Sequence, residues 1–253
     1  MLSRRQLRSK VLQALYAFFQ SGKSDLAVSE RELLRSVDKV YDLYLLLLLL
    51  LVELADADQH DASELHTKFF PKAEELNATH RIYQLKFIQD LRSSNSFNND
   101  IKQHKLSWQK ESDLVRKIFL EIKKSNEYRE YLLHHNADEK EFLVQLIKNC
   151  FVPSEALASF LEESNLYWLD DFDFICHMII KTIKSYYTNH ALMLFPLYKD
   201  DKEDKDFTRQ LFVKTILHST EFEKSISEFN QSHSSRRTVK SSKVSSYNSE
   251  TWS

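Results

Sequence analysis

The chain has 253 residues and a single glycine, Gly22. Hairpin turns and tight connections between strands commonly need glycine, because only glycine adopts positive φ without a steric cost. A strand-rich protein of this length with one glycine would be very unusual. Leu, Lys, Glu and Gln are abundant instead, and these residues lose little side-chain entropy in helices. The composition therefore predicts an all-α fold, a helical bundle.

The scarcity of glycine also excludes several classes of nucleotide-dependent enzyme. The GxGxxG dinucleotide loop, the Walker phosphate loop and the GxSxG nucleophile elbow each need at least two glycines. Cys150 and Cys176 form no CxxC pair, which fits a reduced, cytoplasmic setting. We therefore expect a cytoplasmic protein that is not an enzyme and has no catalytic residues, no metal and no cofactor.

Apolar residues recur at helical spacing along most of the chain. We expect a loop at residues 95–100 and helices at residues 3–21, 29–57, 72–92, 111–134, 138–150, 154–163, 171–194 and 205–229. Gly22 is predicted to cap the first helix at its C-terminal end. The apolar run from Leu43 to Val52 is about half of the ~20 residues that span a membrane. We interpret it as part of a buried core helix and expect no membrane contact.

Acidic residues lie at or just before the start of two of the predicted helices. Asp170, Asp171 and Asp173 lie where a helix is expected to start, so we interpret them as N-capping and dipole-compensating residues. Residues 199–206 (KDDKEDKD) are predicted to form a solvated acidic linker. Neither stretch predicts a metal site.

Residues 230–253 contain nine serines and lack apolar periodicity. Such a segment cannot bury enough surface to offset the entropy of ordering it, so we predict a disordered, basic tail. The alternative is a basic arm that touches RNA.

The first helix has an unusual distribution of charge. Arg4, Arg5 and Arg8 lie in its first turns, and residues 1–24 contain no acid. Cations near a helix N-terminus oppose the macrodipole, so these arginines suggest that an anion sits there. Exposed N–H groups and guanidinium forks together suit a phosphate.

The predicted apolar stripe of the same helix contains Leu7, Val11, Leu12, Leu15, Phe18 and Phe19. Tyr16 lies roughly beside Leu12 and Arg5 and could stack on an RNA base. The other interpretation of Tyr16 is a core aromatic residue with its hydroxyl at the rim.

The stretch SRRQLRSKVLQALYAFFQSG (Ser3 to Gly22) resembles the opening of the NusB family of transcription antitermination factors. Arg4, Arg5 and Arg8 fall on the arginine positions of the family, and residues 12–16 match its A-(L/V)-Q-x-L-Y hallmark. A weaker match, Asp206 to Phe229, resembles the third helix of the family.

The resemblance implies binding of single-stranded, boxA-like RNA together with NusE, a protein of the small ribosomal subunit, within the RNA polymerase antitermination complex. Arg4, Arg5, Arg8 and Tyr16 would be the RNA contacts. It also implies one NusB-like domain at residues 1–229, enlarged by a helical insertion at about 60–200. The second half of the family pattern is missing from this sequence. Two other functions stay open: a helical protein-interaction scaffold, and an accessory domain of an RNA methyltransferase.

Overall fold

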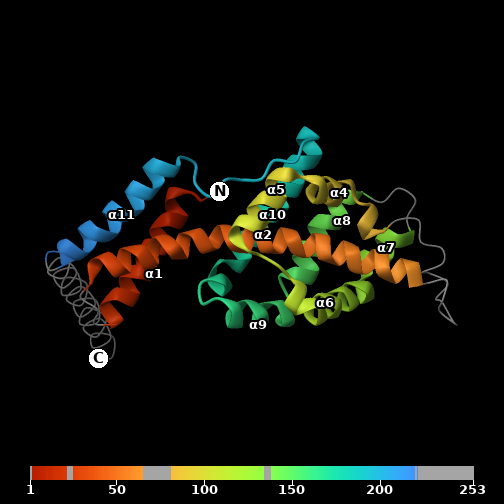
Figure 1. The fold of residues 1–253 in the computed structure, drawn as a ribbon, viewed down its shortest axis with the longest axis horizontal. Coiled ribbons are helices and arrows are strands. Elements are labelled where there is room, and N and C mark those ends of the chain that lie inside the picture. Colours follow the sequence, from red (N-terminus) through yellow and green to blue (C-terminus); the bar gives the residue numbers. More distant parts are fainter. Residues whose placement is uncertain (1, 22–24, 65–80, 134–137, 220, 222–253) are drawn as a thin grey trace, which may run out of the picture. The chain divides into compact units, whose positions relative to one another are not determined.

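The computed structural model describes residues 2–21, 25–64, 81–133, 138–219 and 221. All regular secondary structure in these ranges is helical, which confirms the all-α prediction (Figure 1). The chain divides into two compact units. The first contains residues 1–3 and 35–201, and the second contains residues 4–34 and 202–253.

The first unit is built around α2 (Leu26–Glu64), whose residues from 35 onward belong to it. The leucine run lies in this part, and Leu43, Leu45 and Leu47 have no exposed surface. A helix that is apolar on all sides must be surrounded by other elements. The prediction of a buried core helix is thus confirmed, and no described helix is long and apolar enough to span a membrane.

The other elements of the first unit lie above and below α2 in the view of Figure 1. In chain order they are the 3₁₀ turn η1 (Ile82–Gln84), α4 (Lys86–Ser93), α5 (Asn95–His104), the 3₁₀ turn η2 (Gln109–Glu111), α6 (Ser112–Lys124), α7 (Asn126–Leu133), α8 (Glu139–Leu146), the π-helical turn η3 (Ile147–Phe151), α9 (Glu155–Ser164) and α10 (Trp168–Asn189).

Polar contacts fix these elements to α2. The hydroxyls of Tyr44 on α2 and Thr182 on α10 are 2.7 Å apart. The indole of Trp108 donates to the carbonyl of Leu46 at 3.0 Å. Because these groups are buried, each bond avoids the cost of an unsatisfied polar atom.

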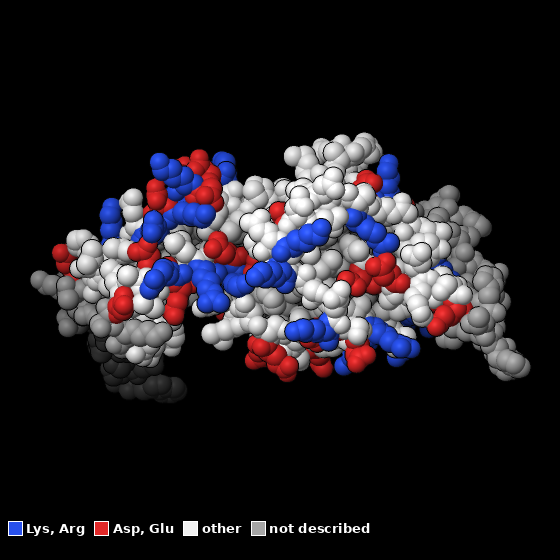
Figure 2. Space-filling model, in the orientation of Figure 1, with Lys and Arg blue, Asp and Glu red and all other residues white. Residues whose placement is uncertain are grey.

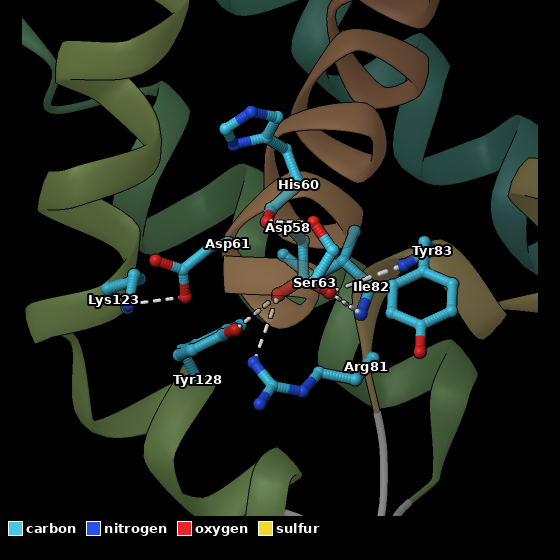
Figure 3. A network of polar contacts seen from close by, with 9 residues as sticks. All are labelled: Asp58, His60, Asp61, Ser63, Arg81, Ile82, Tyr83, Lys123 and Tyr128. Atoms are coloured by element: carbon cyan, nitrogen blue, oxygen red, sulfur yellow. Dashed lines mark hydrogen bonds and ion pairs between the residues drawn. The ribbon is translucent and has the colours of Figure 1, made fainter. Parts of the chain in front are cut away.

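A buried carboxylate, Asp58, joins α2 to two later segments (Figure 3). Its Oδ1 accepts from the hydroxyl of Tyr128 at 2.6 Å, and its Oδ2 accepts from the backbone N–H of Ile82 at 2.7 Å. Nη1 of Arg81 lies 3.5 Å from Oδ1. Burial raises the pKa of Asp58, while the hydrogen bonds and Arg81 oppose that rise.

Several predicted boundaries were wrong. Residues 95–100 are not a loop but begin α5, because the side chain of Ser94 accepts from the backbone N–H of Phe97 and caps the helix. The helix expected at 111–134 is broken at Ser125, whose backbone is extended between α6 and α7.

The start of α10 also differs from the prediction. It begins at Trp168 after Tyr167, which makes no side-chain capping bond, so Asp170 and Asp171 do not cap it. They lie in its first turn, where a carboxylate favours the helix dipole. The cap predicted at Gly22 lies outside the described residues.

The second unit combines α1 (Arg4–Ser21), residues 26–34 of α2 and α11 (Asp201–Leu217). The aromatic rings of Phe18 and Phe212 meet edge to face at 6.2 Å between centroids. Arg209 of α11 pairs with Glu30 of α2 at 2.5 Å. Segments near the two ends of the described chain therefore belong to one unit, and the other unit contains residues 1–3 and 35–201.

Candidate nucleic-acid interface on helix α1

Helix α1 has a buried face and an exposed face. Leu7 and Val11 are buried, and so is Lys10. Leu12 and Phe19, which we predicted in the apolar core stripe, are instead exposed. The predicted apolar stripe included too many residues, because only Leu7 and Val11 among its members are buried.

The guanidinium of Arg4 is not available to a phosphate. Its guanidinium pairs with Glu203 at 2.7 Å and with Asp204 at 2.8 Å, and it stacks 4.2 Å from the ring centroid of Phe207. The Asp204 side chain is only 7% exposed, whereas that of Glu203 is 72% exposed. The contact with Asp204 is therefore the stronger one, since water screens an exposed pair. The anions that pair with Arg4 are therefore carboxylates of the same chain.

The acids that hold Arg4 lie in the stretch predicted to be a linker. Residues 201–206 instead form the first turns of α11. Acidic side chains favour the positive end of a helix dipole, so the acid-rich stretch begins a helix. The same acids compensate the positive end of the α11 dipole and the positive charge at the start of α1.

Arg5 and Arg8 are placed differently from Arg4. Both are exposed, and neither forms an ion pair with any described residue. The guanidinium of Arg8 lies 5.7 Å from the ring centroid of Phe207, at the outer range of a cation–π contact. Both cations are available to an external anion.

Aromatic and apolar side chains follow these two arginines along the same side of α1. At about 100° per residue, Arg5, Arg8, Leu12, Tyr16 and Phe19 fall within an arc of about 80° on α1. Leu12 and Tyr16 are each 68% exposed and Phe19 is 52% exposed. We call these five residues the outer stripe. From Arg5 to Phe19 it is about 21 Å long at 1.5 Å per residue.

The exposure of Tyr16 excludes one of its two interpretations. A core aromatic residue with its hydroxyl at the rim would bury its ring, but this ring is mostly exposed. The core interpretation is therefore wrong. Tyr16 and Phe19 present aromatic surface on the same side of α1 as Arg5 and Arg8.

Both signs of charge appear on the face drawn in Figure 2, and neither covers it alone. Within the described ranges, no group of three or more His, Cys, Asp or Glu side chains could hold a metal ion.

No protein-family model, curated protein or solved structure matches this chain. The resemblance of residues 3–22 to the NusB family therefore stays a prediction, as does the insertion proposed at about 60–200.

Sequence reasoning missed two parts of this site. The first is Phe19, whose spacing of three and seven residues from Tyr16 and Leu12 places it on their face. The second is the partnership of Arg4 with Asp204, 200 residues apart in the chain. A helical wheel could have revealed the first, but only the tertiary structure reveals the second.

Proposed function

We propose that this chain is a non-catalytic RNA-binding protein of the transcription antitermination type, acting on boxA-like single strands of nascent ribosomal RNA together with NusE. The observation that carries the proposal is the outer stripe of α1. It combines exposed Arg5 and Arg8 with the exposed rings of Tyr16 and Phe19.

The chemistry of the outer stripe suits a single strand. Guanidiniums form charge-assisted, forked hydrogen bonds to phosphate oxygens. Aromatic side chains stack on unpaired bases, each contributing about 1–3 kcal/mol. A length of about 21 Å accommodates several nucleotides. In a duplex the bases are already stacked on one another, so the stripe would favour single-stranded RNA.

The roles of the arginines divide. Arg5 and Arg8 contact phosphates in this proposal. Arg4 would hold α11 against α1, since Glu203 and Asp204 already occupy its guanidinium. A phosphate would have to displace two carboxylates to reach Arg4.

The proposal is tested by replacing both exposed arginines, Arg5→Ala together with Arg8→Ala. Binding of a fluorescent boxA-like single strand should weaken at least tenfold, because charge-assisted hydrogen bonds are lost. The slope of log affinity against log salt should become shallower by about 1.4, at ~0.7 per phosphate contact. A matched control, Lys117→Ala with Arg129→Ala, removes two exposed cations of the other unit and should change neither quantity. Equal binding by both double variants would contradict the proposal.

A protein partner is the second candidate for the same surface. Leu12 lies at the centre of the outer stripe and offers neither charge nor a π-face, so its exposure favours a protein contact. Leu12→Ser should weaken binding of purified NusE and leave RNA affinity within about twofold. A loss of RNA affinity alone would contradict this assignment.

A further inference from the structure

An open groove in the first unit lies between α2 and the segment formed by η2 and α6. Its volume is about 500 Å³, which is within the range of about 300–1,000 Å³ that small-molecule sites occupy. On the α6 wall, Val115 and Phe119 are buried and Leu120 is 47% exposed. The α2 wall is polar and carries four carboxylates, those of Glu53, Asp56, Asp61 and Glu64.

Three of the four carboxylates already have a partner within the first unit. The pairs are Asp56 with Arg92, Asp61 with Lys123 at 2.7 Å (Figure 3), and Glu64 with His60 at 3.7 Å. These pairs reduce the negative charge that a ligand in the groove would meet. The fourth carboxylate is therefore the one that can recognise a ligand.

That carboxylate belongs to Glu53, which is half-buried. Its side chain forms no hydrogen bond or ion pair with any described residue. Burial raises the pKa of Glu53, and the neighbouring charge of Asp56 raises it further, although Arg92 opposes the rise. A cation placed beside Glu53 would stabilise the ionised carboxylate, because a close opposite charge favours the charged form.

Arg116 supplies the opposite charge on the α6 wall. It lines the groove and is exposed, and its guanidinium forms no hydrogen bond or ion pair with any described residue. Arg116 and Glu53 do not pair with each other across the groove. The groove therefore presents one anion and one cation on opposite walls, with an apolar surface beside the cation.

We propose that this groove binds a zwitterionic small molecule of the amino-acid class that carries an apolar side chain. The ammonium group of the ligand contacts Glu53, and its carboxylate accepts forked hydrogen bonds from Arg116. The apolar side chain of the ligand packs beside Phe119 and Leu120. A ligand with a single charge would compensate only one wall. The inference is independent of RNA binding by α1.

The open groove sets the expected affinity. A ligand of about a dozen non-hydrogen atoms, bound at an ordinary efficiency per atom, has a dissociation constant on the order of 1 mM. Each ion pair is partly exposed to water, so each should strengthen binding by no more than about fivefold. The test therefore needs closely matched ligands rather than a search for tight binding.

Three compounds with the same phenyl group separate the two charges. L-phenylalanine has both charges, phenethylamine has only the ammonium, and 3-phenylpropionate has only the carboxylate. Titrations of the full chain are followed by NMR at the indole N–H of Trp108, which lines the groove and donates to the carbonyl of Leu46. L-phenylalanine should bind about two- to fivefold more tightly than either other compound. Equal affinities, or no change of the Trp108 signal at about 10 mM ligand, would overturn the proposal.

Two variants assign each charge to its wall of the groove. Glu53→Gln should remove the advantage of L-phenylalanine over 3-phenylpropionate, and Arg116→Gln should remove its advantage over phenethylamine. Glu121→Gln and Lys117→Gln are matched controls, because both residues are exposed on α6 outside the groove lining, and they should leave all three affinities unchanged. The proposal is also overturned if the advantage of L-phenylalanine survives both groove variants, or if the controls reduce it equally.

Discussion

At the scale of single residues, burial decides what a polar group can do. Asp58 is fully buried and accepts from Tyr128, Ile82 and Tyr83, with Arg81 beside it. Removing one member leaves the others buried and incompletely bonded, which costs more than the bond itself contributes. Nothing in the local sequence around Asp58 predicts this network, because its partners lie 23 or more residues away along the chain.

Tyr128→Phe removes the hydroxyl that donates to Asp58. We expect the free energy of unfolding to fall by about 1–3 kcal/mol, because a buried acceptor loses its donor. Urea denaturation followed by circular dichroism measures this change. Tyr83→Phe is the matched control, since the Tyr83 side chain forms no hydrogen bond with the described residues, and it should change stability by less than about 0.5 kcal/mol. Equal effects of the two variants would show that the hydroxyl contributes nothing.

The two cysteines should react at different rates. Cys176 has no exposed surface, and burial together with Asp173 raises its pKa to about 12. Cys150 is only partly buried, although its pKa is also raised. Because the thiolate is the reactive form, an aromatic disulfide reagent at neutral pH should modify Cys150 first. Cys176 should react only on unfolding, and rapid modification of Cys176 in the native protein would contradict its described burial.

At the scale of elements, local sequence predicted which segments are helical more accurately than it predicted the residues at which each helix begins and ends. The apolar periodicity of the leucine run and of residues 154–163 predicted helices that the structure contains. The helix at 95–104 was missed because asparagine-rich sequence resembles a loop, and only the capping bond of Ser94 distinguishes it. The acid-rich start of α11 was missed because a solvated acidic linker and an acid-rich first turn of a helix have the same amino-acid composition.

Arg4 and Arg5 are adjacent in α1 but should have separable roles. Arg4→Ala leaves Asp204 largely buried without its guanidinium, so we expect a loss of about 1–3 kcal/mol in the stability of the second unit. Faster amide hydrogen exchange in α11 reports this loss. Arg5→Ala should leave exchange in α11 unchanged and weaken RNA binding instead. If Arg5→Ala destabilised α11 as much as Arg4→Ala, the division of roles would be wrong.

At the scale of the whole molecule, the sequence predicted the fold class but not the division into units. One glycine and pervasive helical periodicity were enough for an all-α fold. The boundary at residue 34 lies inside the continuous helix α2, where no proline or glycine marks it. Of the predicted RNA contacts, Arg5, Arg8 and Tyr16 lie exposed on one face, whereas Arg4 is held by acids from the other end of the chain.

Photo-cross-linking tests the proposed RNA surface most directly. A boxA-like single strand carrying 5-iodouridine is irradiated with the full chain, and the adducts are located by mass spectrometry. The outer stripe predicts adducts on Tyr16 or Phe19 that disappear when Arg5 and Arg8 are both alanine. Adducts confined to residues 222–253, or adducts on α1 that persist without the two arginines, would contradict it.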